Sequence, residues 1–280
     1  MKTLISKNLR TTTYTATTTP KFGYPIRFAY NCQYRFLEVF CMAPRFYVDT
    51  EFSLDSDIVL PAKPAHHASR VLRMRTGDEA VLFNGRGEEA TVTMTFTSDA
   101  TTAHITHIQT ESVEDHVCLT LIQSLVSQEK LDWILEKATE LGVDRVVIVP
   151  AERSVTKLDE KRLAKRLEQW KNTTISACEQ CARLRFPTVE WAPNLKTALS
   201  ECNAAQKIIL APAATMKVRL EKTESVAFAV GPEGGFSEKE IELAQSFGFD
   251  CMLLGPRVLR TETAGLVALS VAQWAIGDFQ

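Results

Sequence analysis

No part of the 280-residue sequence approaches the roughly 18 consecutive apolar residues that a membrane-spanning helix requires, so we expect a soluble protein with no membrane partner. A strong net charge is also absent. The formal charge of -2 excludes a uniformly basic nucleic-acid coat and confines any RNA contact to a local patch. The glycine-rich loops carry no Walker lysine, which argues against a phosphate-binding α/β enzyme.

The cysteine pattern excludes a small disulfide-bonded scaffold. Seven cysteines are an odd number, and their irregular spacing suits a reducing cytoplasm. Cys118 and Cys251 lie in apolar runs, which predicts buried thiols. Cys178 and Cys181 have the spacing of a metal or redox pair, but no second pair or histidine partner follows them, and the two residues lie in a helical pattern. We therefore expect a cytoplasmic protein without a metal.

Residues 1–41 differ in composition from the rest of the chain. They carry six basic side chains against one acidic side chain and are rich in threonine, with no helical period. A transit peptide, a disordered RNA-binding arm and an upstream extension are three possible interpretations. We favour an extension, disordered or outside the functional fold, because the composition changes at Met42.

Residues 42–113 have the pattern of short strands. An apolar run at 81–83 precedes a glycine turn at 84–87, and alternating or short apolar segments follow at 90–96 and 103–108. Residues 85–90 formally match a dinucleotide-binding fingerprint, but they lead into a strand, so we interpret them as a hairpin turn. The pattern predicts a small β-barrel.

Residues 114–280 alternate between predicted strands and predicted helices. Strands are expected at 118–126, 145–150, 207–211, 226–230 and 251–254. Helices are expected after 127, at 159–185, after a capping box that starts at Ser237, and at about 263–276. Nearly continuous apolar strands that alternate with helices predict an α/β domain with a parallel sheet covered on both faces.

Three loops follow predicted strands at the sheet edge where open α/β folds bind ligands. One contains Ala211, the second is glycine-rich and spans 231–236, and the third spans 255–265. Pro232 lacks an amide donor and Glu233 repels phosphate, so the second loop better suits a neutral or cationic ligand such as a sulfonium. A plain turn remains the alternative for this loop. In the third loop, Thr261 or Thr263 could cap the helix that follows.

Several motifs together resemble a known family. The strongest are Gly231-Pro-Glu-Gly-Gly-Phe236 and Leu254-Gly-Pro-Arg-Val-Leu-Arg-Thr-Glu-Thr-Ala264, with Met42-Ala-Pro-Arg-Phe-Tyr-Val48 at the start. Residues 66–67, 71–73, 77–78, 83–85, 140–143, 152–154 and 179–183 also match. Over residues 42–280 the chain resembles the bacterial 16S ribosomal RNA uridine-N3 methyltransferases of the SPOUT superfamily.

The resemblance implies a PUA-like β-barrel for RNA at 42–113 and a SPOUT methyltransferase domain with a deep trefoil knot at 114–280. It implies S-adenosylmethionine (SAM) as the cofactor and a homodimer that completes each site. The implied reaction methylates N3 of a uridine near the decoding centre, with 16S rRNA or the small ribosomal subunit as partner, during subunit maturation. The alternatives are a related enzyme acting on transfer RNA and a non-catalytic RNA-binding ribosome-assembly factor.

Methyl transfer to uridine N3 requires removal of a weakly acidic proton, which is general-base and electrostatic work. Arg260 or Arg183 could stabilise the uracil anion, and Glu179, Glu262 or Glu233 could accept the proton. Arg183 and Glu179 rank first because both could project from one helical turn, although an intrahelical ion pair is the alternative. The cofactor-binding residues expected are Leu210, Ala211, Gly231, Glu233, Gly234, Leu254, Gly255, Leu259, Thr261, Thr263 and Ala264. The RNA-binding residues expected are Arg45, His66, His67, Arg70, Arg73 and Arg75.

Overall fold

The computed structural model describes residues 43–111, 116–211 and 220–279. The predicted extension at 1–41 lies outside the described residues. Within the described ranges, no helix combines the length and apolarity needed to cross a membrane.

The N-terminal part is a five-stranded sheet in the order β1-β3-β4-β5-β2. Its strands are β1 (Arg45–Tyr47), β2 (Asp57–Val59), β3 (Glu79–Phe83), β4 (Glu88–Phe96) and β5 (Thr101–Thr110). Two helical segments, α1 (Ala62–His66) and η1 (His67–Val71), connect β2 to β3. Strands β3 and β4 pair antiparallel on either side of the turn at 84–87, which confirms the predicted hairpin.

The C-terminal part is a six-stranded sheet in which all pairs are parallel, in the order β11-β9-β10-β6-β7-β8. Its strands are β6 (Cys118–Ser124), β7 (Arg145–Val149), β8 (Thr188–Trp191), β9 (Gln206–Leu210), β10 (Ser225–Val230) and β11 (Asp250–Met252). Five successive residues of β10, starting at Val226, are buried because helices cover both faces. The predicted α/β fold with a parallel sheet is confirmed.

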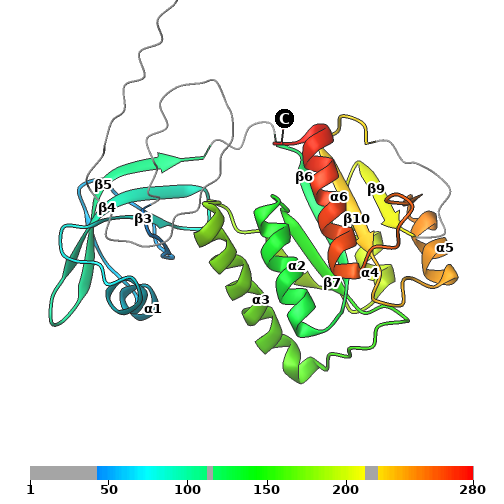
Figure 1. The fold of residues 1–280 in the computed structure, drawn as a ribbon, viewed down its shortest axis with the longest axis horizontal. Coiled ribbons are helices and arrows are strands. Elements are labelled where there is room, and N and C mark those ends of the chain that lie inside the picture. The colour runs from blue at the N-terminus through cyan, green and yellow to red at the C-terminus, as the bar shows by residue number, and fades with distance from the viewer. Residues whose placement is uncertain (1–42, 112–115, 212–219, 280) are drawn as a thin grey trace, which may run out of the picture. The chain divides into compact units, whose positions relative to one another are not determined.

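Helices α2 (Gln128–Glu140), α3 (Glu160–Cys181) and α6 (Thr261–Ile276) pack on one face of this sheet, as Figure 1 shows for α2 and α6. Helices α4 (Leu195–Ser200) and α5 (Glu238–Ser246) pack on the other. Side chains of β7 alternate between the two cores, since Val146 belongs to the first and Val147 to the second. The predicted capping box at Ser237 is present, with Glu240 as its reciprocal partner.

Helix α3 ends earlier than the prediction of 159–185, because Ala182 adopts a left-handed conformation with φ 63°. The residues that follow it leave the helix and reach the hairpin turn of the β-barrel part. Phe186 donates its N–H to the carbonyl of Gly85 at 3.2 Å, and Gly87 donates to Leu184 at 3.1 Å. Phe186 also stacks edge-on to Tyr47, with 4.8 Å between ring centroids. The end of α3 therefore joins the two sheets.

Both predictions of buried thiols in apolar runs are wrong. Cys118 is exposed and Cys251 is half-buried. Both lie at or near the ends of strands, where neighbouring strands and helices cover a side chain less completely. Cys178 is buried within α3, and its burial raises the pKa of the thiol to about 12.

Candidate active site

A pocket of about 350 Å³ lies where the chain leaves strands β9, β10 and β11 at their carboxyl ends. The three predicted loops thus meet at one edge of the sheet, as expected for an open parallel sheet. The lining residues are Lys130, Leu210, Ala211, Val230, Gly231, Pro232, Glu233, Gly235, Met252, Leu253, Leu254, Arg257, Val258, Leu259, Arg260, Thr261, Glu262 and Ala264. Most of these are apolar or contribute backbone.

The structure brings eight of the predicted cofactor residues to this pocket: Leu210, Ala211, Gly231, Glu233, Leu254, Leu259, Thr261 and Ala264. Three others do not line it. The carbonyl of Gly234 accepts a hydrogen bond from Arg153, Gly255 takes φ 80° in the loop after β11, and Thr263 donates its N–H to Arg260 in the first turn of α6. Their role as cofactor contacts stays a prediction.

The hydroxyl of Thr261 connects segments that form the pocket. Its hydroxyl, on the first residue of α6, donates to the carbonyl of Gly231 at 2.6 Å and accepts from the amide of Gln123 at 3.0 Å. Gln123 is fully buried near the end of β6, so two buried hydrogen bonds connect three distant segments. The predicted capping role of Thr261 is not observed, because Arg260 begins the helix without a side-chain cap.

A second set of contacts fixes the glycine-rich loop from outside. Arg153, in the loop after β7, donates from Nη1 to the carbonyls of Gly234 at 3.1 Å and Phe236 at 3.4 Å. The hydroxyl of Ser237 donates to Oε2 of Glu152 at 2.7 Å. A Cβ on Gly231 would lie 2.8 Å from the backbone nitrogen of Phe236, so this position requires glycine.

The pocket is bordered by carboxylates and by cations. Nζ of Lys130 lies 2.7 Å from Oε1 of Glu233. Partial burial opposes ionisation, but the hydrogen bond from Lys130 and a backbone hydrogen bond hold the pKa of Glu233 below its ordinary value. Oε2 of Glu262 is buried and meets no hydrogen-bond donor among the described residues, and its Oε1 lies 3.9 Å from the exposed guanidinium of Arg260. The carboxylate of Glu262 is therefore only weakly paired within the described part of the chain.

These features fit the cofactor implied by the resemblance. An apolar lining suits an adenine ring, close backbone at Gly231 suits a ribose, and the carboxylates of Glu233 and Glu262 suit a positively charged sulfonium. Lys130 and Arg153 were not predicted as site residues, although Arg153 lies in the matching segment 152–154. Neither belongs to a glycine-rich loop, and their partners Glu233 and Gly234 are 103 and 81 positions away in the sequence.

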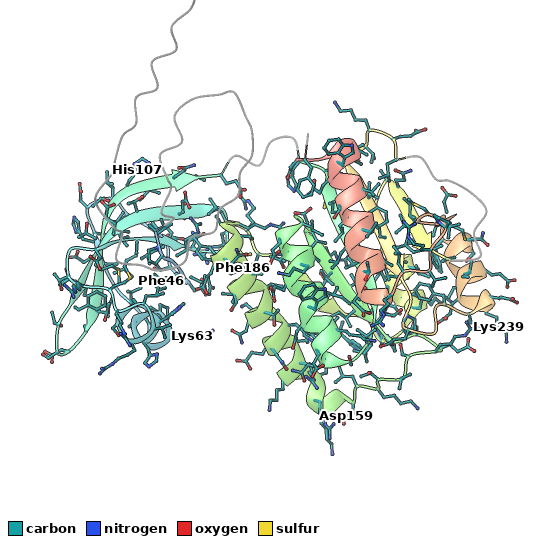
Figure 2. The ribbon with its side chains drawn as sticks, viewed as in Figure 1. Phe46, Lys63, His107, Asp159, Phe186 and Lys239 are labelled. Carbon is teal, nitrogen blue, oxygen red and sulfur yellow. The ribbon has the colours of Figure 1, made fainter. Side chains whose placement is uncertain are left out.

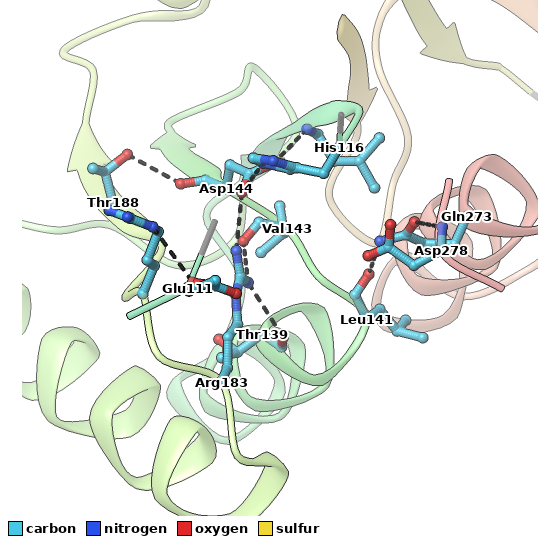
Figure 3. A network of polar contacts seen from close by, with 12 residues as sticks. Glu111, His116, Thr139, Leu141, Val143, Asp144, Arg183, Thr188, Gln273 and Asp278 are labelled. Carbon is cyan, nitrogen blue, oxygen red and sulfur yellow. Dashed lines mark hydrogen bonds and ion pairs between the residues drawn. The ribbon is translucent and has the colours of Figure 1, made fainter. Parts of the chain in front are cut away.

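Glu179 and Arg183 lie away from this pocket. Oε1 of Glu179 accepts the N–H of Tyr47 at 3.1 Å. Arg183 lies beyond the end of α3 and donates to the carboxylate of Asp144 at 3.0 Å and to the carbonyl of Thr139 at 3.3 Å (Figure 3). The two side chains therefore neither project from one helical turn nor pair with each other, and their role in substrate handling stays a prediction.

The predicted RNA-binding residues fall into two groups. His66, Arg70, Arg73 and Arg75 are exposed on and after the segment α1–η1. Arg45 is different, because its side chain is only 10% exposed, lies 2.8 Å from Glu89 and sits over the ring of Phe83. The half-buried ring of His67 contacts Phe46 edge-on. The exposed group is thus better placed to meet RNA than Arg45 or His67.

Comparisons with known proteins agree with this geometry. Residues 113–273 match the model of an RNA methyltransferase domain, and residues 60–114 match that of an RNA methyltransferase PUA domain. The chain is 32% identical to ribosomal RNA small subunit methyltransferase E of Bacillus subtilis, over 77% of this chain and 89% of that protein.

Solved structures are similar as well. A ribosomal RNA small subunit methyltransferase E from Neisseria gonorrhoeae, bound to S-adenosyl methionine, superposes with a TM-score of 0.76 at 34% identity, covering 85% of this chain and 100% of that chain. A Legionella pneumophila methyltransferase in complex with SAM gives a TM-score of 0.80 at 34% identity, covering 85% of this chain and 99% of that one.

Proposed function

Because this chain belongs to the RNA methyltransferase family that includes the ribosomal RNA small subunit methyltransferases E, we propose that it methylates N3 of a uridine in 16S rRNA with SAM as methyl donor. The observation that carries the proposal is the pocket itself. Eight residues selected from sequence motifs, in three separate loops, converge on one cavity with carboxylates and exposed arginines at its border. A non-catalytic assembly factor would not need this arrangement.

Leu210, Gly231, Leu254, Leu259 and Ala264 would hold SAM, which supplies an electrophilic methyl group when bound. The chain's own residues then act on the uracil. Glu262 lines the pocket with its side chain 17% exposed, and its carboxylate would take the N3 proton directly or through water. Arg260, which lines the pocket, would stabilise the negative charge that develops on the uracil oxygens.

The partners follow from the same proposal. The substrate is 16S rRNA or the small ribosomal subunit, held in part by the exposed basic residues of the PUA-like part, and the reaction takes place in the cytoplasm without a metal. Large apolar side chains exposed on the C-terminal segment support a homodimer, since Val258 is 81% and Trp274 71% exposed. We also propose that the domain at 114–280 forms the predicted trefoil knot.

A methylation assay tests the function. Purified protein is incubated with labelled SAM and either 16S rRNA or small subunits lacking modifications, and the modified base is located by the block it causes in reverse transcription. We expect one modified uridine. Glu262→Gln should lower kcat by about 10²–10⁴-fold, because it removes a general base. Tight RNA binding without methylation would favour the assembly-factor alternative, and methylation of transfer RNA would favour the related enzyme.

A further inference from the structure

The first half of α3 carries basic side chains that no ion pair with a described residue explains. Lys157 precedes the helix, and Lys161 and Lys165 follow on its exposed side; we call these three residues the α3 strip. Residues at spacing i and i+4 share one helix face. Trp170 and Leu163 point the other way, into the core and its border. The α3 strip therefore faces solvent.

The placement of these charges is unfavourable for the helix itself. Between residues 157 and 166 there are five basic and two acidic side chains, whereas the last turn of α3 has no basic residue. The positive end of the helix dipole lies at the N-terminus, where cations are disfavoured, and cations are favoured at the C-terminus. Asp159 and Glu160 at the start of α3 follow this rule, whereas the basic side chains that surround them and the lack of basic residues in the last turn do not. Function accounts better for a pattern that costs stability.

Helix α3 also connects the two regions that an RNA substrate must reach. It starts after the loop that carries Arg153, whose guanidinium contacts the glycine-rich loop of the pocket. It ends beside the barrel hairpin, where Phe186 packs on Tyr47; Figure 2 labels Asp159 and Phe186 near its two ends. With 22 residues at 1.5 Å each, the helix is about 33 Å long.

The neighbouring helix has the opposite charge. A groove of about 590 Å³ along α2 and α3 is bordered by the carboxylates of Asp132, Glu136 and Glu140, and Lys137 pairs with two of these. On this pair of helices the positive charge is thus concentrated at the start of α3, in a protein whose net charge is -2. Such segregation is typical of a surface that meets a polyanion.

We propose that the α3 strip binds the phosphate backbone of the substrate RNA between the barrel and the active-site pocket. The proposal rests on the proposed function and adds a contact surface that no sequence motif indicated. Phosphate contacts fix the position of RNA without reading its sequence, which suits three flexible lysines.

The test uses full-length protein with Lys161→Glu and Lys165→Glu combined. A matched control combines Lys196→Glu and Lys239→Glu, which reverse the charge of two exposed lysines on α4 and α5, on the opposite face of the sheet. Binding to a 16S rRNA transcript is measured by fluorescence anisotropy at several salt concentrations, and SAM binding by calorimetry. We expect the α3 variant to bind RNA at least about tenfold more weakly. The slope of its log Kd against log salt concentration should be smaller by the equivalent of about two phosphate contacts.

Its Kd for SAM and its kcat at saturating RNA should equal those of the wild type. Equal losses in the α3 variant and the control would overturn the proposal, because they would reflect net charge alone. A loss with assembled subunits but not with free RNA would also overturn it, in favour of a ribosomal protein as the contact. Wild-type protein that binds RNA through the α3 strip but never methylates it would contradict the proposed function and still support the proposed RNA-binding surface.

Discussion

At the scale of single residues, Thr261 has the most consequential position in the site. Its hydroxyl both donates and accepts within the protein interior, and its two partners come from β6 and from the loop after β10. Removing the hydroxyl would deprive the buried amide of Gln123 of one acceptor and the buried carbonyl of Gly231 of this donor. Unsatisfied buried groups of this kind cost about 1–3 kcal/mol.

We therefore expect Thr261→Val, which keeps the side-chain shape, to lower the free energy of unfolding by about 1–3 kcal/mol and to raise the Kd for SAM about tenfold. Thr261→Ser keeps the hydroxyl and should restore both values nearly to those of the wild type. Urea denaturation and calorimetry measure the two quantities. Equal behaviour of the valine and serine variants would show that the hydroxyl does not support the pocket.

At the scale of elements, the joint between the two sheets depends on a glycine turn. Gly85 has φ 71°, and a Cβ at this position would lie 2.2 Å from the ring of Phe186. Gly77 also has a positive φ of 96°, but a Cβ added there would meet no described atom within 4 Å. Alanine substitutions at Gly85 and Gly77 therefore separate the cost of backbone strain, which both would carry, from the cost of overpacking, which only Gly85 would carry.

Gly85→Ala should lower stability more than Gly77→Ala does, by about a further 1–3 kcal/mol, because only the first substitution overpacks the joint as well as straining the backbone. Thermal unfolding followed by circular dichroism compares the two variants. If both variants lose the same stability, the contact between Gly85 and Phe186 contributes nothing.

The same elements show what the sequence could predict. Long apolar strands such as β6 and β10 were predicted because burial on both faces leaves a continuous signal. The short elements β8 and α4 were not, since four to six residues carry too little periodicity. The end of α3 was placed too late, because Ala182 adopts a left-handed conformation that its residue type does not indicate.

The site residues also divide into those that the sequence predicted and those that it did not. Glycine-rich and arginine-rich loops were visible as motifs, and most of their members meet at the pocket. Gln123 and Arg153 were not selected, because each acts through a partner more than 80 positions away. Contacts of that range depend on strand order, which no local pattern determines. The expected proximity of Glu179 and Arg183 failed for the related reason that a helix was extended past its end.

At the scale of the whole molecule, the exposed apolar residues of α6 provide a test of the proposed dimer. Val271 and Trp274 are three positions apart on one helix face and are 39% and 71% exposed. Val271→Glu combined with Trp274→Glu should convert a dimer into a monomer in sedimentation velocity experiments, because it places charge on an apolar interface.

Trp133→Glu is the control, since Trp133 is 50% exposed on α2 and lies beside Lys137 rather than on α6. It should leave the sedimentation coefficient unchanged. A wild-type protein that sediments as a monomer at high concentration would contradict the dimer proposal directly.

The hydrogen bonds from Gln123 through Thr261 to Gly231 have a further consequence for the protein's lifetime. They close the pocket with contacts that span up to 138 residues of sequence. A ligand that binds only the folded form adds to stability by mass action, about 2.7 kcal/mol when its concentration is one hundred times its Kd. The resistance of this protein to proteases should therefore increase with the concentration of SAM, so that the supply of methyl donor also sets the lifetime of the folded enzyme in a proteolysis experiment.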